Sequence, residues 1–323
     1  MSSSAPPKII PGPDSGHHSP QLRVRARPIY PGTRYKITRR CLERRFFLTP
    51  SPVLNHLIGY WLAVCLKEHN IQLHAACFMS NHYHLDVTDV DGNLPAFKNH
   101  FNATLARLIN SHLGRSDKFW AEDRPSDVRL LEDDDVIEKM AYTLANPTAA
   151  GLVKWGSRWP GFTTYSMAFG DTMGFEKPGR FFDPHNSDLP RVVELCLVRP
   201  AVDQGCSDEH VHRRLMAAVR RRELEKQREM RMANHRFIGK SRLFRQRWDR
   251  VPQMSSRKSG LNPTFASMNK WARIAQVRRD RAWEATYAAA RDAFRGGVRD
   301  VVFPFGTYWM RVFGGVRVCL IET

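Results

Sequence analysis

The chain has 323 residues, 42% of them hydrophobic and 25% charged, which is enough for two domains with a substantial core. Its 50 Lys and Arg residues against 32 Asp and Glu give a formal net charge of +18, and this excess favours a polyanionic partner, nucleic acid above all. No apolar run is long enough to span a bilayer, and no secretory signal is recognisable. We therefore expect no membrane association and a cytoplasmic, nucleoid-associated protein. The cysteines form no C-x-x-C pair, which argues against a zinc ribbon and a disulfide framework.

The first part of the chain predicts a short leader followed by an α+β domain. Residues 1–28 are rich in Ser, Pro and Gly and predict a flexible leader. The elements that follow are predicted from apolar periodicity and turn residues: a strand from about 33, a helix from Ser51-Pro52 to Asn70, strands over 71–79 and 82–90, a helix over about 95–112, a strand near 128–131 and a helix over about 135–145. This order matches a ferredoxin-like split βαβ domain over 29–170, an antiparallel sheet with helices on one face.

The remaining residues, 171–323, are predicted to form a mostly helical, basic accessory region. Residues 1–169 have a net charge of +5, so the 154 residues that follow have +13. Helices are expected over about 208–235 and 264–295. The alternating end of the chain, Val301–Phe305 with Val312–Leu320, predicts a β-hairpin.

Two histidines on a predicted strand are candidate metal ligands. His82 and His84 are two residues apart, so their side chains leave the same face of a strand and can converge on one cation. Imidazoles suit several divalent metals, although two histidines on a strand are often only polar residues on a solvated face. Asp86 shares the face but lies too far from His82 to be a joint ligand, and is expected to support the site or to lie at the surface.

The helix predicted over 135–145 carries a candidate nucleophile. Tyr142 and Asn146 are four residues apart and therefore lie on one helix face, beside the stripe of Ile137, Met140, Ala141 and Leu144 that should pack on the sheet. Asp133-Asp134-Asp135 supplies an N-cap and an acidic first turn, and Asn146-Pro147 with Gly151 should close the helix. An exposed tyrosine followed by a terminating Asn-Pro is the plainer interpretation of the same pattern.

The two motifs together resemble a known family. Met79-Ser80-Asn81-His82-Tyr83-His84-Leu85, followed by Tyr142-Thr143-Leu144-Ala145-Asn146-Pro147 and Ala150-Gly151-Leu152-Val153, is similar to the REP-associated tyrosine transposases and related HUH-type single-tyrosine transposases. The resemblance covers about residues 28–170. It departs from the family at Ser80, where proline is usual, at Ala149, where a basic residue is usual, and at Asp86, where an aliphatic residue is common.

The resemblance implies a DNA transposase that cleaves and rejoins single-stranded DNA. It implies Tyr142 as the nucleophile, His82, His84 and Asn146 as ligands of Mg²⁺ or Mn²⁺, and a 5′-phosphotyrosyl intermediate. Single-stranded or hairpin DNA is the expected substrate.

The C-terminal basic cluster has two interpretations. Arginines interleaved with aromatic residues favour contacts with phosphates and unpaired bases, with these DNA-binding candidates: Arg236, Lys240, Arg242, Arg245, Arg247, Trp248 and Arg250. The alternative is a scaffold on which the catalytic domain packs or forms a homodimer. For the whole chain, the rival to a transposase is a catalytically silent or domesticated nucleic-acid-binding protein that retains the fold. A hydrolase of small substrates with a His-x-His metal site is disfavoured by the charge.

Overall fold

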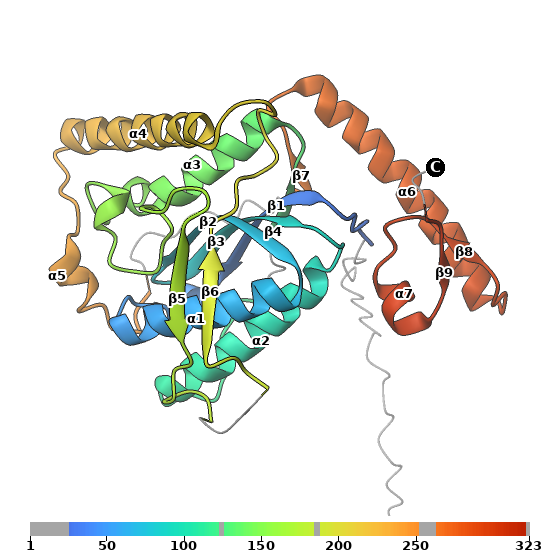
Figure 1. Ribbon diagram of the computed structural model, residues 1–323, viewed down its shortest axis with the longest axis horizontal. Coiled ribbons are helices and arrows are strands. Elements are labelled where there is room, and N and C mark those ends of the chain that lie inside the picture. Colours follow the sequence, from blue (N-terminus) through green and yellow to red (C-terminus); the bar gives the residue numbers. More distant parts are fainter. Residues whose placement is uncertain (1–25, 123–125, 184–187, 252–262, 321–323) are drawn as a thin grey trace, which may run out of the picture.

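A computed structural model describes residues 26–122, 126–183, 188–251 and 263–320 (Figure 1). Most of the predicted leader lies outside these ranges. The helices and strands in chain order are β1 (Thr33–Arg40), α1 (Pro52–Glu68), β2 (Ile71–Met79), β3 (His82–Asp89), α2 (Leu94–His112), β4 (Ser126–Leu130), α3 (Asp133–Ala149), β5 (Thr172–Glu176), β6 (Val192–Cys196), α4 (Asp208–Met232), α5 (Lys240–Leu243), β7 (Phe265–Ala266), α6 (Lys270–Arg295), β8 (Val302–Phe303), α7 (Trp309–Gly314) and β9 (Arg317–Val318). None of the helices in the described ranges is long and apolar enough to cross a bilayer.

The central sheet has the strand order β2-β3-β1-β4-β7. The first four strands pair antiparallel in the order of a ferredoxin-like sheet, as predicted. The fifth strand corrects the prediction of a wholly antiparallel sheet, because β7 pairs with β4 in parallel. This two-residue strand comes from the basic C-terminal region, so that region contributes to the sheet.

Helices cover both faces of the sheet, which corrects the prediction of helices on one face. Phe101 of α2 packs against Tyr83 of β3, and α1 and α2 lie together on that side (Figure 1). The opposite face of β3 carries His84, which contacts Tyr142 of α3. The third helix therefore covers the second face.

The α3 helix is longer than predicted. It begins with Glu132 as N-cap and continues through Asn146 and Pro147 to Ala149, and Gly151 with φ +70° follows its end. The predicted stop at Asn146-Pro147 is wrong. Helix α4 packs along α3, and Pro147 is buried, so tertiary packing offsets the backbone hydrogen bond that proline cannot make.

Residues beyond 170 share the core of the domain. Phe175, Leu195 and Leu215, from β5, β6 and α4, belong to the same buried cluster as Phe101 and Leu85. The β5-β6 pair lies against α1, and α4 lies against α3. Removing all residues beyond 170 would therefore expose apolar core surface.

The end of the chain forms a small separate cluster around α6. Phe303 of β8 packs with Ala290 of α6 and with Val316. The predicted hairpin is wrong, because β8 and β9 pair in parallel and α7 lies between them.

Candidate active site

The pairing of β1 with β3 builds one polar face at the centre of the sheet. Thr38 lies opposite His84, and Arg40 lies opposite His82. The two imidazole centroids are 4.8 Å apart. The structure thus brings the two predicted metal ligands together on one face, as their spacing requires.

Hydrogen bonds orient both imidazoles. The Nδ1 atom of His82 lies 2.7 Å from Oδ1 of Asn81, and Nδ1 of His84 lies 2.8 Å from Oγ1 of Thr38. Because the Asn81 oxygen can only accept, Nδ1 of His82 donates, and Nε2 retains a lone pair. For His84, Nε2 lies 3.3 Å from Nδ2 of Asn146, an amide donor, so Nδ1 again carries the hydrogen. In this tautomer Nδ1 donates its hydrogen to an oxygen atom, and Nε2 has a lone pair that can bind a metal.

Both histidines are held in the neutral state that metal binding requires. Removal from water, followed by the positive charges of Arg40 and Lys36, lowers the pKa of His82 to about 4. Burial, followed by the charge of Lys36, lowers the pKa of His84 well below its usual value. A cation at this site therefore competes with few protons at neutral pH.

The helix α3 brings Tyr142 and Asn146 to the same place. The ring of Tyr142 lies edge-on to the ring of His84, with the two centroids 5.5 Å apart. Tyr142 is 41% exposed. The side chain of Asn146 is buried, and its Nδ2 atom is hydrogen-bonded to Nε2 of His84. The half-exposed Tyr142 thus lies next to His84, which in turn contacts His82 and Asn146.

The neighbouring tyrosines are poor rivals for Tyr142. Tyr83 lies on the opposite face of β3, is 1% exposed and donates its hydroxyl to Asn102. Tyr165 donates to the carboxylate of Glu223, and burial followed by that negative charge raises the pKa of Tyr165 to about 12. Neither hydroxyl is available at the imidazole face.

A buried ion pair anchors α3 beside Tyr142. The Nζ atom of Lys36 lies 3.5 Å from Oδ2 of Asp86. Lys36 also donates a hydrogen bond to the hydroxyl of Thr143, and that hydroxyl donates to Asp86. Burial lowers the pKa of Lys36 and raises that of Asp86, since it disfavours both charges, while each partner opposes the shift of the other. The same Nζ atom lies 5.1 Å from the ring centroid of Tyr142. Asp86 is therefore buried and supports the site, and the expectation of a surface position does not hold.

Sequence reasoning missed the basic residues that β1 contributes. Arg40 is exposed opposite His82, and Lys36 is buried opposite Asp86. The alternation of Arg34, Lys36, Thr38 and Arg40 in β1 was a usable signal, because these polar side chains share one face of a strand. Their partners on β3 depend on a register that no local pattern specifies.

The segment 236–250 lies against the turn that precedes His82. Leu243 is fully buried with Cys77 and Met79 of β2, and Ser80 donates to Oε1 of Gln246 at 2.7 Å. Ser80 thus holds this segment against the turn. The DNA-binding candidates are all exposed: Arg236, Lys240, Arg242, Arg245, Arg247, Trp248 and Arg250.

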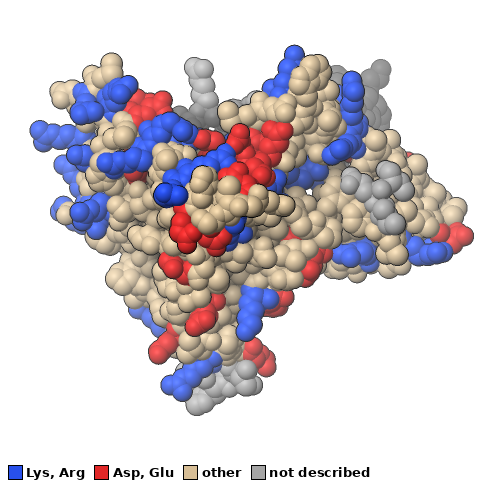
Figure 2. Space-filling model, turned by 45° about the horizontal axis from the view of Figure 1, so that its top comes forward, with Lys and Arg blue, Asp and Glu red and all other residues tan. Residues whose placement is uncertain are grey.

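Two of these candidates also have protein partners. Arg247 pairs with Asp249 at 2.8 Å, and Trp248 packs near Phe47 and under the guanidinium of Arg115. Lys and Arg side chains gather on the side of the molecule that carries α4 and α5, next to acidic side chains (Figure 2). This side of the molecule is therefore mixed in charge.

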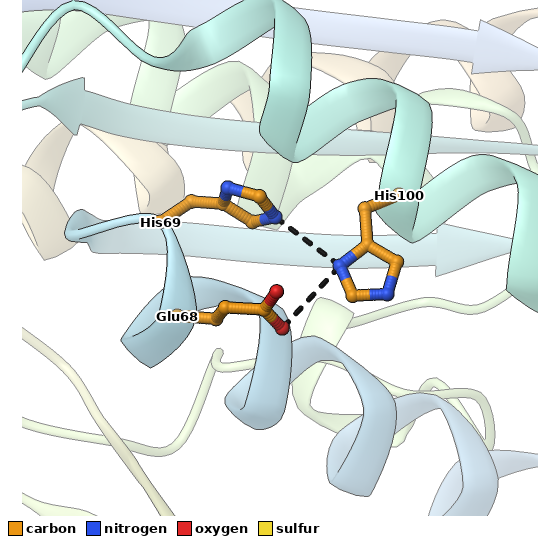
Figure 3. A group of neighbouring side chains, drawn as sticks. All are labelled: Glu68, His69 and His100. Atoms are coloured by element: carbon orange, nitrogen blue, oxygen red, sulfur yellow. Dashed lines mark hydrogen bonds and ion pairs between the residues drawn. The ribbon is translucent and has the colours of Figure 1, made fainter.

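A second group of metal-ligating side chains lies on the helical layer that covers the other face of the sheet. Glu68 and His69 at the end of α1 and His100 of α2 point toward one another (Figure 3), and together they could hold a metal ion. His69 and His100 are 31 residues apart in the sequence, and this distance hid the group from sequence reasoning. Only the packing of α1 against α2 joins its members.

Comparison with known proteins gives a partial structural likeness. No protein-family model matches the sequence, and no curated protein matches it. The structure is similar to that of a REP-associated tyrosine transposase bound to a REP hairpin, with 18% identity and a TM-score of 0.37. The match covers 43% of this chain and 81% of that one. A likeness at this level assigns no activity to the chain.

Proposed function

We propose that the protein cleaves and rejoins single-stranded DNA through a covalent bond between Tyr142 and a 5′-phosphate. The observation that carries the proposal is the convergence of Tyr142, Asn146, His82 and His84, from two elements some sixty residues apart, on one polar face. The resemblance of the motifs to HUH-type transposases names the same four residues.

The donor set fits a divalent cation such as Mg²⁺ or Mn²⁺. His82 and His84 would each supply Nε2, and Asn146 would supply Oδ1 after a half-turn of its amide. When bound, such an ion polarises a phosphodiester and offsets charge on the oxygen that leaves.

The reaction follows from the position of the phenol. The oxygen of Tyr142 attacks phosphorus, the bond to the 3′ oxygen breaks, and the strand ends as a free 3′-hydroxyl and a tyrosine-linked 5′-phosphate. Attack by a 3′-hydroxyl on the same phosphorus reverses the step without an external energy source. Lys36 lies beside the Tyr142 ring and helps to hold it in place, and the exposed guanidinium of Arg40 can contact a phosphate near His82.

The C-terminal basic segment would guide the strand toward this face. Gln246 and Leu243 dock the segment next to Ser80, two residues before His82. Exposed Arg242, Arg245 and Arg250 belong to this segment and would supply the cationic contacts that single-stranded DNA needs.

A covalent-trapping assay tests the proposal. Labelled single-stranded hairpin DNA and Mn²⁺ or Mg²⁺ should give a protein–DNA adduct on a denaturing gel. Tyr142→Phe should abolish the adduct and leave hairpin binding unchanged, whereas Tyr165→Phe should retain both. Hairpin binding without any adduct would instead favour the rival function, a silent nucleic-acid-binding protein that keeps the fold.

A further inference from the structure

We propose that Glu68, His69 and His100 bind a transition-metal ion, with Zn²⁺ the best fit, at a site separate from that of His82 and His84. The site lies where the end of α1 meets α2, on the side of the sheet opposite Tyr142. It does not depend on the function proposed above.

The distances between ligand atoms match a tetrahedral ion. Zinc bonds to nitrogen and oxygen are about 2.0–2.2 Å, which places two ligands of a tetrahedron roughly 3.3–3.5 Å apart. Nε2 of His69 lies 3.2 Å from Nδ1 of His100, and Oε2 of Glu68 lies 3.4 Å from that same Nδ1 (Figure 3). All the ligand atoms lie within 4.8 Å of one another. Two edges of the tetrahedron are therefore already formed, and the third closes by a turn of the half-exposed Glu68 side chain.

Aromatic neighbours hold both imidazoles in place. Trp61 of α1 meets the ring of His100 edge-on at 5.0 Å, and Phe97 of α2 meets His69 edge-on at 6.3 Å. The Trp61 indole is itself fixed by a hydrogen bond to the carbonyl oxygen of Phe101. Ligands that are already oriented lose little freedom when they bind an ion.

The charge at the end of α1 also favours a cation. The last carbonyl groups of a helix give its C-terminus a partial negative charge, and a carboxylate there is unfavourable. Glu68 is the last residue of α1, and His69 is its C-cap. A divalent cation held by both would offset the carboxylate and the helix terminus together.

The chemical role of such an ion is structural. Three protein ligands leave a fourth position for water, but no predicted catalytic group lies on this side of the sheet. The ion would join α1 to α2, the two helices that cover the Tyr83 face. A site of this kind stabilises the folded state because the unfolded chain does not assemble it.

Metal titration of the full-length protein tests the site. After treatment with a chelator, His82→Ala/His84→Ala protein should still bind about one equivalent of Zn²⁺, and Co²⁺ in its place should give the intense visible absorption of a tetrahedral centre. Adding His100→Ala should remove that equivalent and the absorption, and Glu68→Ala should weaken binding. His210→Ala, a change of an exposed histidine on α4, is the matched control and should change neither.

Melting and cleavage measurements complete the test. Zn²⁺ should raise the melting temperature of the wild-type protein and of His82→Ala/His84→Ala, but not that of the triple variant His82→Ala/His84→Ala/His100→Ala. Hairpin cleavage by His100→Ala with Mn²⁺ should equal that of the wild type. Retention of the Zn²⁺ equivalent in the triple variant, or its absence in His82→Ala/His84→Ala, would overturn the proposal and leave a hydrogen-bonded histidine pair.

Discussion

The buried pair of Lys36 and Asp86 allows a quantitative prediction about what holds the Tyr142 helix in place. The side chains are 8% and 1% exposed, so neither charge is solvated by bulk water. Asp86→Leu introduces an apolar side chain and leaves the Lys36 ammonium buried without a carboxylate. Loss of one partner of such a pair costs ~3–5 kcal/mol of unfolding free energy.

The double variant Lys36→Met/Asp86→Leu should recover that loss. Replacing both charges with apolar groups of similar volume is often neutral or stabilising, so we expect unfolding free energy within ~1 kcal/mol of the wild type. Urea unfolding measures the unfolding free energy of both variants. The dependence of that free energy on urea concentration should equal that of the wild type. The single variants Asp86→Leu and Lys36→Met complete the comparison. If the destabilisation of the double variant equals the sum of the destabilisations of the two single variants, the two side chains are not coupled and the reasoning is wrong.

The same double variant separates stability from catalysis. It lacks the ammonium 5.1 Å from the Tyr142 ring, although its fold should be restored. We expect adduct formation at saturating hairpin to slow about tenfold, corresponding to ~1.4 kcal/mol, within the range of a desolvated cation–π contact. An unchanged rate would show that Lys36 only anchors α3.

Three further predictions concern the metal ligands, acid stability and DNA binding. His82→Ala should suppress adduct formation far more than hairpin binding in a gel-shift assay, because phosphate contacts elsewhere supply most of the affinity; equal loss of both would point to a docking role. Burial lowers the pKa of His74 to about 4, so the unfolded state binds more protons than the folded one between about pH 4 and 6.5, and stability is lost as pH falls through that window. This shift makes the unfolding free energy about 3 kcal/mol lower at pH 4 than at pH 6.5, and His74→Gln should remove that difference. Urea unfolding at each pH measures it, and an equally steep pH dependence in the variant would contradict this prediction. Substituting Arg242, Arg245 and Arg250 with Gln should flatten the salt dependence of hairpin binding by roughly 0.7 log units per lost contact, whereas an unchanged slope would show that they only solvate the surface.

The sequence predicted the elements of the domain because their signals are local. The order of strands and helices up to α3 is confirmed, and so is the shared face of His82 and His84, which follows from the two-residue repeat of a strand. The four-residue spacing likewise placed Tyr142 and Asn146 on one helix face. Their roles in chemistry stay predictions.

The errors all come from long-range packing. The α3 helix passes through Pro147 because α4 covers it, which the Asn-Pro signal cannot reveal. The alternating residues near the C-terminus suit a hairpin as well as two short parallel strands, and only the intervening α7 decides between them. The Lys36–Asp86 pair and the His69–His100 contact depend on register and on helix packing for the same reason.

The most direct test of the central claim is to identify the residue that carries DNA after cleavage. The protein is incubated with a labelled hairpin and Mn²⁺, digested with protease, and the nucleotide-bearing peptide is sequenced by mass spectrometry. We predict a single modified peptide in which Tyr142 is linked to a 5′-phosphate, and a free 3′-hydroxyl on the released strand. Modification of a different residue, or cleavage that leaves no nucleotide on the protein, would contradict the account.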